Sequence, residues 1–437
     1  MFKINKNKSI IVLSTLLHSS LAFSASKTKY LYINNFSNTN ISNLQTEKVD
    51  SSDWDGVSRP DKNINGKSLA AGQRISEREE INTYNNTHCF NLNINMKDEI
   101  PNIRICMDSD WTNQNWRTLY IGNKYDVVSY GQANDVYIDV INHVDLQNWT
   151  SNLPDSMLIT KMSIPGTHDS STWHYNNFIM NSFVRTQRTS STFFAQLDEG
   201  IRFFDIRVKP EKDYVWSLYH AKFYLGISFN QFLENISEWL VKHPAETIFV
   251  SIKEDVSNIG APSNNEILSK YINDYSIKIK WQLDVNDSTT LAHTRGKLIL
   301  LNRFSETPGI NLKPWPDDVP NGSFISNSFR VWLQDSYRSG GSDKSNAILR
   351  FMYNHFKSPS SDLKFNFMSS STSSCLFKPQ VCKNSFMPLV NFAINQNSEN
   401  SSGSYSDIKY FPNGIIPMDF YDIEFLRLIA AMNHINF

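Results

Sequence analysis

The first third of the chain contains short runs in which apolar and polar residues alternate. They lie at residues 30–33, 119–121 and 136–140, and clusters of Asn, Ser, Asp and Gly separate them. Two more alternating runs flank a predicted turn within residues 89–106. Alternation places every second side chain on one face of a strand. The region 25–145 is therefore predicted to be an all-β, sandwich-like accessory domain.

After residue 145 the pattern changes to continuous apolar runs with helical segments between them. Residues 146–155 are expected to form the linker to this second region. Continuous apolar strands are typical of a parallel sheet that helices cover. The region 156–437 is thus predicted to be an irregular TIM-type β/α barrel, and a doubly wound sheet is the alternative fold. The predicted strands lie at residues 158–163, 202–208, 247–253, 297–303, 330–336, 363–368 and 415–421.

One helix of the second region has clear sequence signals at both ends. Ser228 and Gln231 have the spacing of a capping box, and Pro244 follows the predicted end. Between them, the apolar residues recur at helical spacing and predict one buried face. They are Phe229, Phe232, Leu233, Ile236 and Leu240.

The N-terminal residues have the composition of a secretory signal peptide. Lys3, Lys6 and Lys8 precede an apolar stretch at residues 10–21, which is too short to span a bilayer. Small residues near Ser24 predict cleavage after that position, so residues 1–24 would be removed and the protein secreted. A buried N-terminal helix is the alternative interpretation.

Four cysteines in an exported chain favour two disulfides over a metal site. Cys89 and Cys106 have the opposite parity to the apolar positions of the predicted hairpin, so they share its other face and could meet across the strands. Cys375 and Cys382 are close in sequence. We therefore predict the pairs 89–106 and 375–382, with buried free thiols as the alternative.

The overall charge of the chain argues against nucleic-acid binding and against a general attraction to anionic lipid. The chain has 42 basic and 43 acidic residues and a formal net charge of −1. It lacks the basic excess of a nucleic-acid-binding protein, so no nucleic-acid partner is expected. Any contact with a lipid surface must be local. Phe178, Ile179, Met180 and Phe183 could form such a contact, or they could be the buried face of a short helix.

Residues suited to catalysis follow the ends of several predicted strands, where the active site of a barrel is built. Taken singly, each has a structural interpretation: a histidine can be a hydrogen-bonded structural residue, and an arginine an ion-pair partner. Together they supply an acid/base pair, a cation for a phosphate and groups that bind a polyol. They are His168, Asp169, Asp205, Arg207, His220, Lys253, Arg303, Asp335, Tyr337 and Asp419.

Several of these residues stand in motifs that occur in a known order. The chain from about residue 150 to 437 resembles the X domain of bacterial-type phosphatidylinositol-specific phospholipases C, whereas the N-terminal region does not. The motifs are SIPGTHDS at 163–170, QLDEGIRFFDIR at 196–207, LYH at 218–220, HPAETIFVSIK at 243–253, GKLILLNR at 296–303, QDSY at 334–337 and GIIPMDFY at 414–421.

The resemblance implies a role for each residue of the acid/base pair. His168 would be the general base for the inositol 2-hydroxyl, and His220 the general acid for the leaving diacylglycerol. Asp419 would orient His168, and Asp169 would support His220. The products would be diacylglycerol and inositol 1,2-cyclic phosphate.

The same resemblance assigns the groups that hold the substrate. Arg207 would bind the phosphate, and Asp205 would fix Arg207. Lys253, Arg303 and Asp335 would contact inositol hydroxyls, and Tyr337 would stack on the ring. The substrate would be phosphatidylinositol or a glycosyl-phosphatidylinositol at a membrane surface, with transient membrane contact; the oligomeric state is not indicated.

The resemblance also predicts that no metal cofactor is needed. The calcium-dependent branch of the family has Asn after the first histidine and Glu two residues before the Asp of the second motif. This chain has Asp169 and Phe203 at those positions, and Arg207 after Asp205. A guanidinium can stabilise a phosphate oxygen in place of a cation.

Two alternatives to this function remain at the level of sequence. Another barrel phosphodiesterase, of the glycerophosphodiesterase or sphingomyelinase D type, would also use two histidines but would need Glu and Asp metal ligands near the first. Phe203 and Arg207 argue against it. A lipid-binding or glycan-binding, toxin-like module is the non-enzymatic alternative, and the intact histidine pair argues against that.

Overall fold

The computed structural model describes much of the chain from residue 26 to residue 434. The predicted signal peptide and the predicted Cys375–Cys382 pair lie outside the described residues. Within those residues, no helix is both long and apolar enough to cross a bilayer. The described residues are 26–49, 64–82, 87–108, 118–132, 135–177, 179–275, 278–326, 329–356, 361–371 and 414–434.

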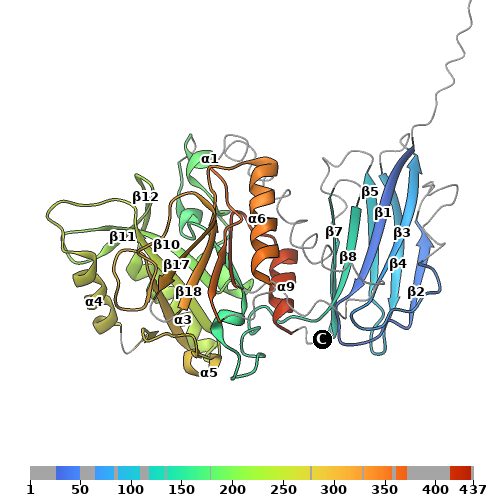
Figure 1. The fold of residues 1–437 in the computed structure, drawn as a ribbon, viewed down its shortest axis with the longest axis horizontal. Coiled ribbons are helices and arrows are strands. Elements are labelled where there is room, and N and C mark those ends of the chain that lie inside the picture. The colour runs from blue at the N-terminus through green and yellow to red at the C-terminus, as the bar shows by residue number, and fades with distance from the viewer. Residues whose placement is uncertain are drawn as a thin grey trace, which may run out of the picture.

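The N-terminal strands form two sheets at one end of the molecule (Figure 1). One sheet has the order β3-β1-β8-β7-β6, in which β1 runs parallel to β8; the other has the order β2-β4-β5. Their facing side chains, among them Leu31, Phe90 and Val127, share one buried core. The bounds are β1 Ser26–Asn35, β2 Asn43–Lys48, β3 Arg74–Asn82, β4 Thr87–Asn95, β5 Asn102–Asp108, β6 Thr118–Ile121, β7 Tyr125–Gln132 and β8 Asp135–Asn142.

The predicted hairpin is formed by β4 and β5, and its disulfide is present. Cys89 and Cys106 are direct cross-strand partners with Cα atoms 4.1 Å apart, and their sulfurs are bonded. Phe90, Leu92 and Ile105 point to the opposite, buried face. The prediction of the 89–106 pair is confirmed.

The rest of the chain forms a curled, mostly parallel sheet with helices around it (Figure 1). The strand order is β14-β15-β13-β10-β9-β20-β19-β18-β17, so the first parallel strand, β9, pairs with the last, β20. Within the described residues, no pairing joins the β14–β15 edge to the β17–β18 edge, and the barrel is open there. The bounds are β9 Ser163–Thr167, β10 Phe203–Pro210, β11 Trp216–His220, β12 Phe223–Ser228, β13 Thr247–Glu254, β14 Lys280–Gln282, β15 Lys297–Asn302, β16 Ile310–Asn311, β17 Val319–Ser326, β18 Phe329–Asp335, β19 Leu363–Asn366 and β20 Gly414–Met418.

The predicted position of the first barrel strand was wrong. Residues 158–163 were expected to form it, but β9 begins only at Ser163, and Ile159–Lys161 is a 3₁₀ turn. The apolar residues of this run are buried in a turn. Apolar content alone does not distinguish a buried turn from a buried strand. Pro165 and Gly166 lower the strand propensity of the true strand. Gly166 is required there, because a Cβ atom at this position would lie 2.6 Å from a ring carbon of Phe203.

The helices of this region cover the sheet. The capping box of Ser228 and Gln231 is present at the start of α3, and the predicted apolar face is buried. Both predictions are confirmed. The bounds are α1 Asn181–Val184, α2 Phe193–Asp198, α3 Phe229–Lys242, α4 Asn264–Asp274, α5 Leu291–Thr294, α6 Gly341–Phe356 and α9 Ile423–Ala431.

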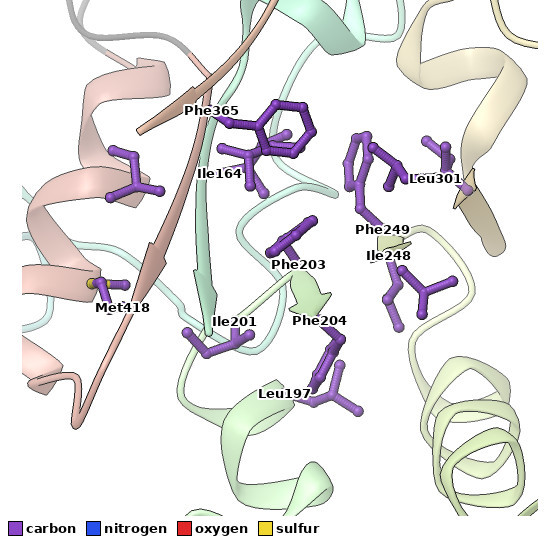
Figure 2. Packing of buried hydrophobic residues seen from close by; sticks show 14 of the residues in the cluster. Ile164, Leu197, Ile201, Phe203, Phe204, Ile248, Phe249, Leu301, Phe365 and Met418 are labelled. Atoms are coloured by element: carbon purple, nitrogen blue, oxygen red, sulfur yellow. The ribbon is translucent and has the colours of Figure 1, made fainter. Parts of the chain in front are cut away.

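The N-terminal sheets and the barrel make direct contact through α9. Arg427 of α9 lies 2.6 Å from Asp126 of β7, and both side chains are buried. Residues 146–155, predicted to be a linker, lie packed against the barrel: Trp149 is fully buried and donates to the carbonyl of Gly200 at 2.9 Å. The interior of the barrel is apolar, with Phe203, Phe249 and Phe365 directed toward its centre (Figure 2).

Candidate active site

The alternation of side chains along each barrel strand explains where the polar groups lie. Phe203 points into the barrel (Figure 2), so Asp205 and Arg207, two and four residues later on β10, share its inward face. By the same period, Lys253 follows Phe249 on β13, and Arg303 follows Leu301 at the end of β15. The apolar core of the barrel thus ends in a layer of charged side chains.

These side chains line one cavity of about 510 Å³. Nine of the ten predicted site residues lie on its wall, from seven different strands or the loops after them. Asp205 is the exception, because it is buried behind Arg207. Enclosure of this size, with a few convergent polar groups, is typical of a small-molecule site. The nine are His168, Asp169, Arg207, His220, Lys253, Arg303, Asp335, Tyr337 and Asp419.

His168 lies between two carboxylates. Its Nδ1 is 2.8 Å from Oδ1 of Asp419, and its Nε2 is 3.3 Å from Oδ2 of Asp169. Burial by itself lowers the pKa of His168, but the negative charges of Asp169 and Asp419 raise it to about 9. Because Nδ1 donates to Asp419, Nε2 is the nitrogen that can accept a proton from a molecule in the cavity.

His220 faces His168 across Asp169. Its Nε2 is 3.1 Å from Oδ2 of Asp169, the oxygen that also contacts His168. Its Nδ1 is 2.7 Å from the carbonyl oxygen of Val184, which accepts the Nδ1 proton. When His220 is protonated, its Nε2–H therefore points into the cavity as a proton donor.

Arg207 is fixed by carboxylates on several sides. Its Nε and Nη2 donate to both oxygens of Asp205, at 3.0 and 2.7 Å, and its Nε lies 3.3 Å from Asp169. Burial raises the pKa of Asp205, but the adjoining guanidinium lowers it more. Burial also raises the pKa of Asp169, but the positive charges of His168, His220 and Arg207 lower it more. Both carboxylates are thus held ionised.

A second group of polar residues occupies the neighbouring wall. The guanidinium carbon of Arg303 lies 4.0 Å from the centre of the Trp315 ring, and the Trp315 Nε1–H donates to Asp335 at 3.1 Å. Burial and the nearby Arg207 lower the pKa of Arg303 to about 10. Burial and Arg207 also lower the pKa of Lys253. Tyr337 donates to Asp317 at 2.8 Å.

Three residues at this site adopt the left-handed backbone conformation, which is rare for residues other than glycine. They are Asp169 (φ 43°), Ala221 (φ 48°), which follows His220, and Phe420 (φ 45°), which follows Asp419. Strained backbone of this kind persists only where the surrounding contacts fix it, and it clusters at functional sites.

Asp255 and Trp315 are among the residues of the cavity wall that were not predicted from the sequence. Asp255 contacts Arg207 and Lys253, and Trp315 joins Arg303 to Asp335. Asp255 stands two residues after Lys253 at the same strand end, which was a usable signal. Trp315 lies in a loop with no periodic pattern, so no signal in the sequence identified it.

Only part of this site has the geometry of metal ligands. In the described part of the chain, His168, Asp169 and Asp205 each place one ligand atom within 4.8 Å of the others. Both oxygens of Asp205 already accept hydrogen bonds from Arg207, and Oδ2 of Asp169 contacts both histidines. These carboxylates are thus already in contact with Arg207 and with the two histidines.

Comparison with known proteins agrees with this geometry. Residues 162–304 match the family described as "Phosphatidylinositol-specific phospholipase C, X domain". The chain is therefore similar to this family over those residues. The 1-phosphatidylinositol phosphodiesterase of Staphylococcus aureus strain Newman is 29% identical over 216 residues, which cover 46% of this chain and 68% of the relative. That of Listeria monocytogenes is 27% identical over 312 residues, covering 68% and 87%.

The fold of the X-domain region also matches a solved structure. A phosphatidylinositol-specific phospholipase C from S. aureus superposes with a TM-score of 0.58 at 24% identity, covering 66% of this chain and 97% of that one. This likeness concerns the fold. It leaves about a third of the chain without a counterpart in that structure.

Proposed function

We propose that the chain is a secreted, metal-independent phospholipase C that converts phosphatidylinositol into diacylglycerol and inositol 1,2-cyclic phosphate. The observation that carries this proposal is the placement of His168 and His220 on either side of Asp169 in one cavity, beside Arg207. The substrate is the one named for the bacterial relatives. A phosphodiester bound over Asp169 would have one imidazole on the attacking side and the other on the leaving side.

His168 acts as the base of the proposed reaction. In its neutral form, its Nε2 takes the proton of the inositol 2-hydroxyl as that oxygen forms a bond to phosphorus. Asp419 accepts the Nδ1–H bond and stabilises the imidazolium that results. Because the attacking hydroxyl belongs to the same molecule as the phosphate, its proximity is already supplied.

His220 acts as the acid. The bond between phosphorus and the glycerol oxygen breaks, and the Nε2 proton of protonated His220 passes to that oxygen. The carbonyl of Val184 holds the other ring nitrogen, so the ring cannot turn its Nε2 away from the cavity without losing that hydrogen bond. After the step, His168 carries the proton that the substrate lost and His220 is neutral.

Arg207 provides the positive charge for the phosphate. Asp205 orients its planar guanidinium from behind, so that charge faces the cavity before the substrate arrives. A cation that is already oriented stabilises the developing negative charge without reorganisation. This is the basis for proposing metal independence.

Lys253, Arg303, Asp335 and Tyr337 are proposed to bind the inositol. The Nη1 of Arg303 is buried and makes no hydrogen bond to any described residue. A buried donor without an acceptor is costly, and an inositol hydroxyl would supply one. Trp315 keeps Arg303 and Asp335 in adjacent positions.

Three further parts of the proposal rest on features outside the cavity. Secretion rests on residues 1–24. Membrane contact is assigned to Ile179, which is 78% exposed and precedes α1, and to Phe183 of α1, which is 41% exposed and lines the cavity. Met180 packs against the core instead, and Phe178 is outside the described residues. The accessory role of residues 25–145 rests on the separate core of their two sheets.

Replacement of each histidine by alanine tests the proposal. His168→Ala and His220→Ala are each expected to lose phosphatidylinositol turnover by a factor of about 10² to 10⁴ while vesicle binding is kept. His293→Ala is the matched control, because His293 is an exposed residue of α5 on the opposite end of the barrel. Unchanged turnover in both cavity variants would exclude the proposed chemistry.

A further inference from the structure

Asp255 lies on the cavity wall but takes no part in the proposed proton transfers. It follows the last residue of β13, its backbone N–H donates to the carbonyl of Val208 at 2.9 Å, and its side chain is 9% exposed. The backbone bond ties Asp255 to β10, which also carries Arg207. The carboxylate is therefore placed by two strands of the barrel rather than by a loose loop.

One oxygen of this carboxylate holds the turn that follows the general acid. Oδ2 of Asp255 accepts a hydrogen bond from the backbone N–H of Ala221 at 2.9 Å. Ala221 directly follows His220 in the turn between β11 and β12 and has a φ of 48°. A residue with a Cβ rarely keeps that conformation unless a contact fixes it. The side chain of Ala221 is exposed, so the hydrogen bond to Asp255 is a contact that holds its backbone in this conformation, beside the pairing of His220 with Phe223.

The other oxygen lies between two cations. Oδ1 of Asp255 is 3.4 Å from Nη1 of Arg207 and 3.4 Å from Nζ of Lys253. Arg207 is held in addition by Asp205 and Asp169, whereas the ion pair of Lys253 among the described residues is with Asp255. Loss of the Asp255 charge would therefore affect Lys253 more than Arg207.

We propose that Asp255 is a positioning residue for the general acid: its carboxylate fixes the Ala221 turn and thereby aims His220 at the leaving-group oxygen. Through its second oxygen it also keeps Lys253 beside Arg207 in the inositol subsite. This inference rests on the proposed function. The first role predicts a loss of kcat that appears only when the leaving group needs a proton, which a general loss of structure would not produce.

The leaving group provides the discriminating measurement. Diacylglycerol leaves as an alkoxide and needs a proton from His220, whereas 4-nitrophenolate is a stable anion and leaves without one. Turnover of phosphatidylinositol is therefore compared with turnover of the 4-nitrophenyl ester of inositol 1-phosphate. His220→Ala defines the pattern of a lost acid: a large loss on the lipid and a small loss on the nitrophenyl ester.

Two variants of Asp255 separate its two contacts. Asp255→Ala removes both, and we expect kcat on the lipid to fall about tenfold or more with less than about threefold loss on the nitrophenyl ester. Asp255→Asn keeps an oxygen for the Ala221 N–H but removes the charge. We expect its kcat on the lipid to stay within about threefold of the wild type while KM rises, because Lys253 has lost its counter-charge.

The result that overturns the inference is an equal loss on the two substrates for Asp255→Ala, or unchanged kinetics for it. An Asp255→Asn variant as poor in kcat as Asp255→Ala would also overturn it, since the hydrogen bond to the turn would then not be the deciding contact. Failure of the proposed function gives a different result: the wild-type protein itself would release no cyclic phosphate from phosphatidylinositol.

Discussion

The imidazole of His168 lies 2.8 Å from the carboxylate of Asp419, a residue 251 positions later in the chain. The two meet because β9, the first parallel strand, pairs with β20, the last. Their register places Thr167 beside Met418. His168 and Asp419, which directly follow these two residues, therefore lie at the same edge of the sheet. The pairing of the first parallel strand with the last is thus what brings together the base and the carboxylate that orients it.

The first prediction concerns this pair. Asp419→Asn removes a charge that raises the pKa of His168 and disturbs the acceptor that fixes its tautomer. We expect kcat to fall by about 10² to 10⁴. The remaining activity should reach its plateau at a lower pH than in the wild type, because the loss of a neighbouring negative charge lowers the pKa of His168. Steady-state kinetics across pH measure both effects, and an unmoved plateau would contradict the assignment.

The second prediction concerns the wild-type pH profile. The base must be neutral to accept a proton, and neighbouring carboxylates hold the pKa of His168 at about 9 in the free protein. Activity requiring neutral His168 is therefore low well below that pH and increases as His168 loses its proton. We expect kcat/KM for the 4-nitrophenyl ester, which reports the free enzyme and needs no proton from His220, to rise by about tenfold per pH unit through neutrality. A rising limb that ends at or below the ordinary histidine pKa of about 6.5 would contradict this electrostatic account.

The third prediction concerns the contact between the N-terminal sheets and the barrel. Arg427→Leu would leave Asp126, which is 0% exposed, without its guanidinium partner. Removing one member of a buried ion pair costs about 3–5 kcal/mol in the free energy of unfolding. Urea unfolding measures that loss. Lys242→Ala, which breaks the exposed pair with Glu238, is the control and should cost less than about 1 kcal/mol. Equal effects of the two variants would show that the buried contact adds no stability.

The fourth prediction concerns the disulfide. Cys89 and Cys106 close a loop of 17 residues. Replacing both with serine should lower the stability of the N-terminal sheets by about 3 kcal/mol, chiefly by loosening the unfolded chain. Since the cavity lies wholly in the barrel, turnover at a temperature below unfolding should not change. Thermal unfolding with and without reductant, alongside an activity assay, checks both statements.

The barrel and most of its site could be predicted because the relevant residues follow strands with strong apolar patterns. Lys253 and Arg303 come directly after runs of apolar residues. Side chains alternate between the two faces of a strand, and this alternation places both residues on the inward face. The motifs then gave each residue a role. The roles of these residues remain predictions, whereas their convergence on one cavity is observed.

Local sequence pattern does not predict the structure where tertiary contacts outweigh it. β9 contains Pro165 and Gly166, and it forms a strand because buried neighbours on both sides supply hydrogen bonds and a close ring contact. In the N-terminal part, β3 was not predicted, since charged residues such as Arg74 and Glu77 interrupt its alternation. Trp315 was missed because it acts from a loop, through contacts with Arg303 and Asp335 that only the fold creates.

The central claim is that two histidines and an arginine cleave the phosphodiester without a metal ion. Incubation of the purified protein with phosphatidylinositol vesicles in excess chelator, followed by ³¹P NMR of the water-soluble products, tests it most directly. The account predicts that inositol 1,2-cyclic phosphate forms at the same rate with and without chelator. Turnover that stops in chelator and returns with added calcium, or a first product other than the cyclic phosphate, would contradict it.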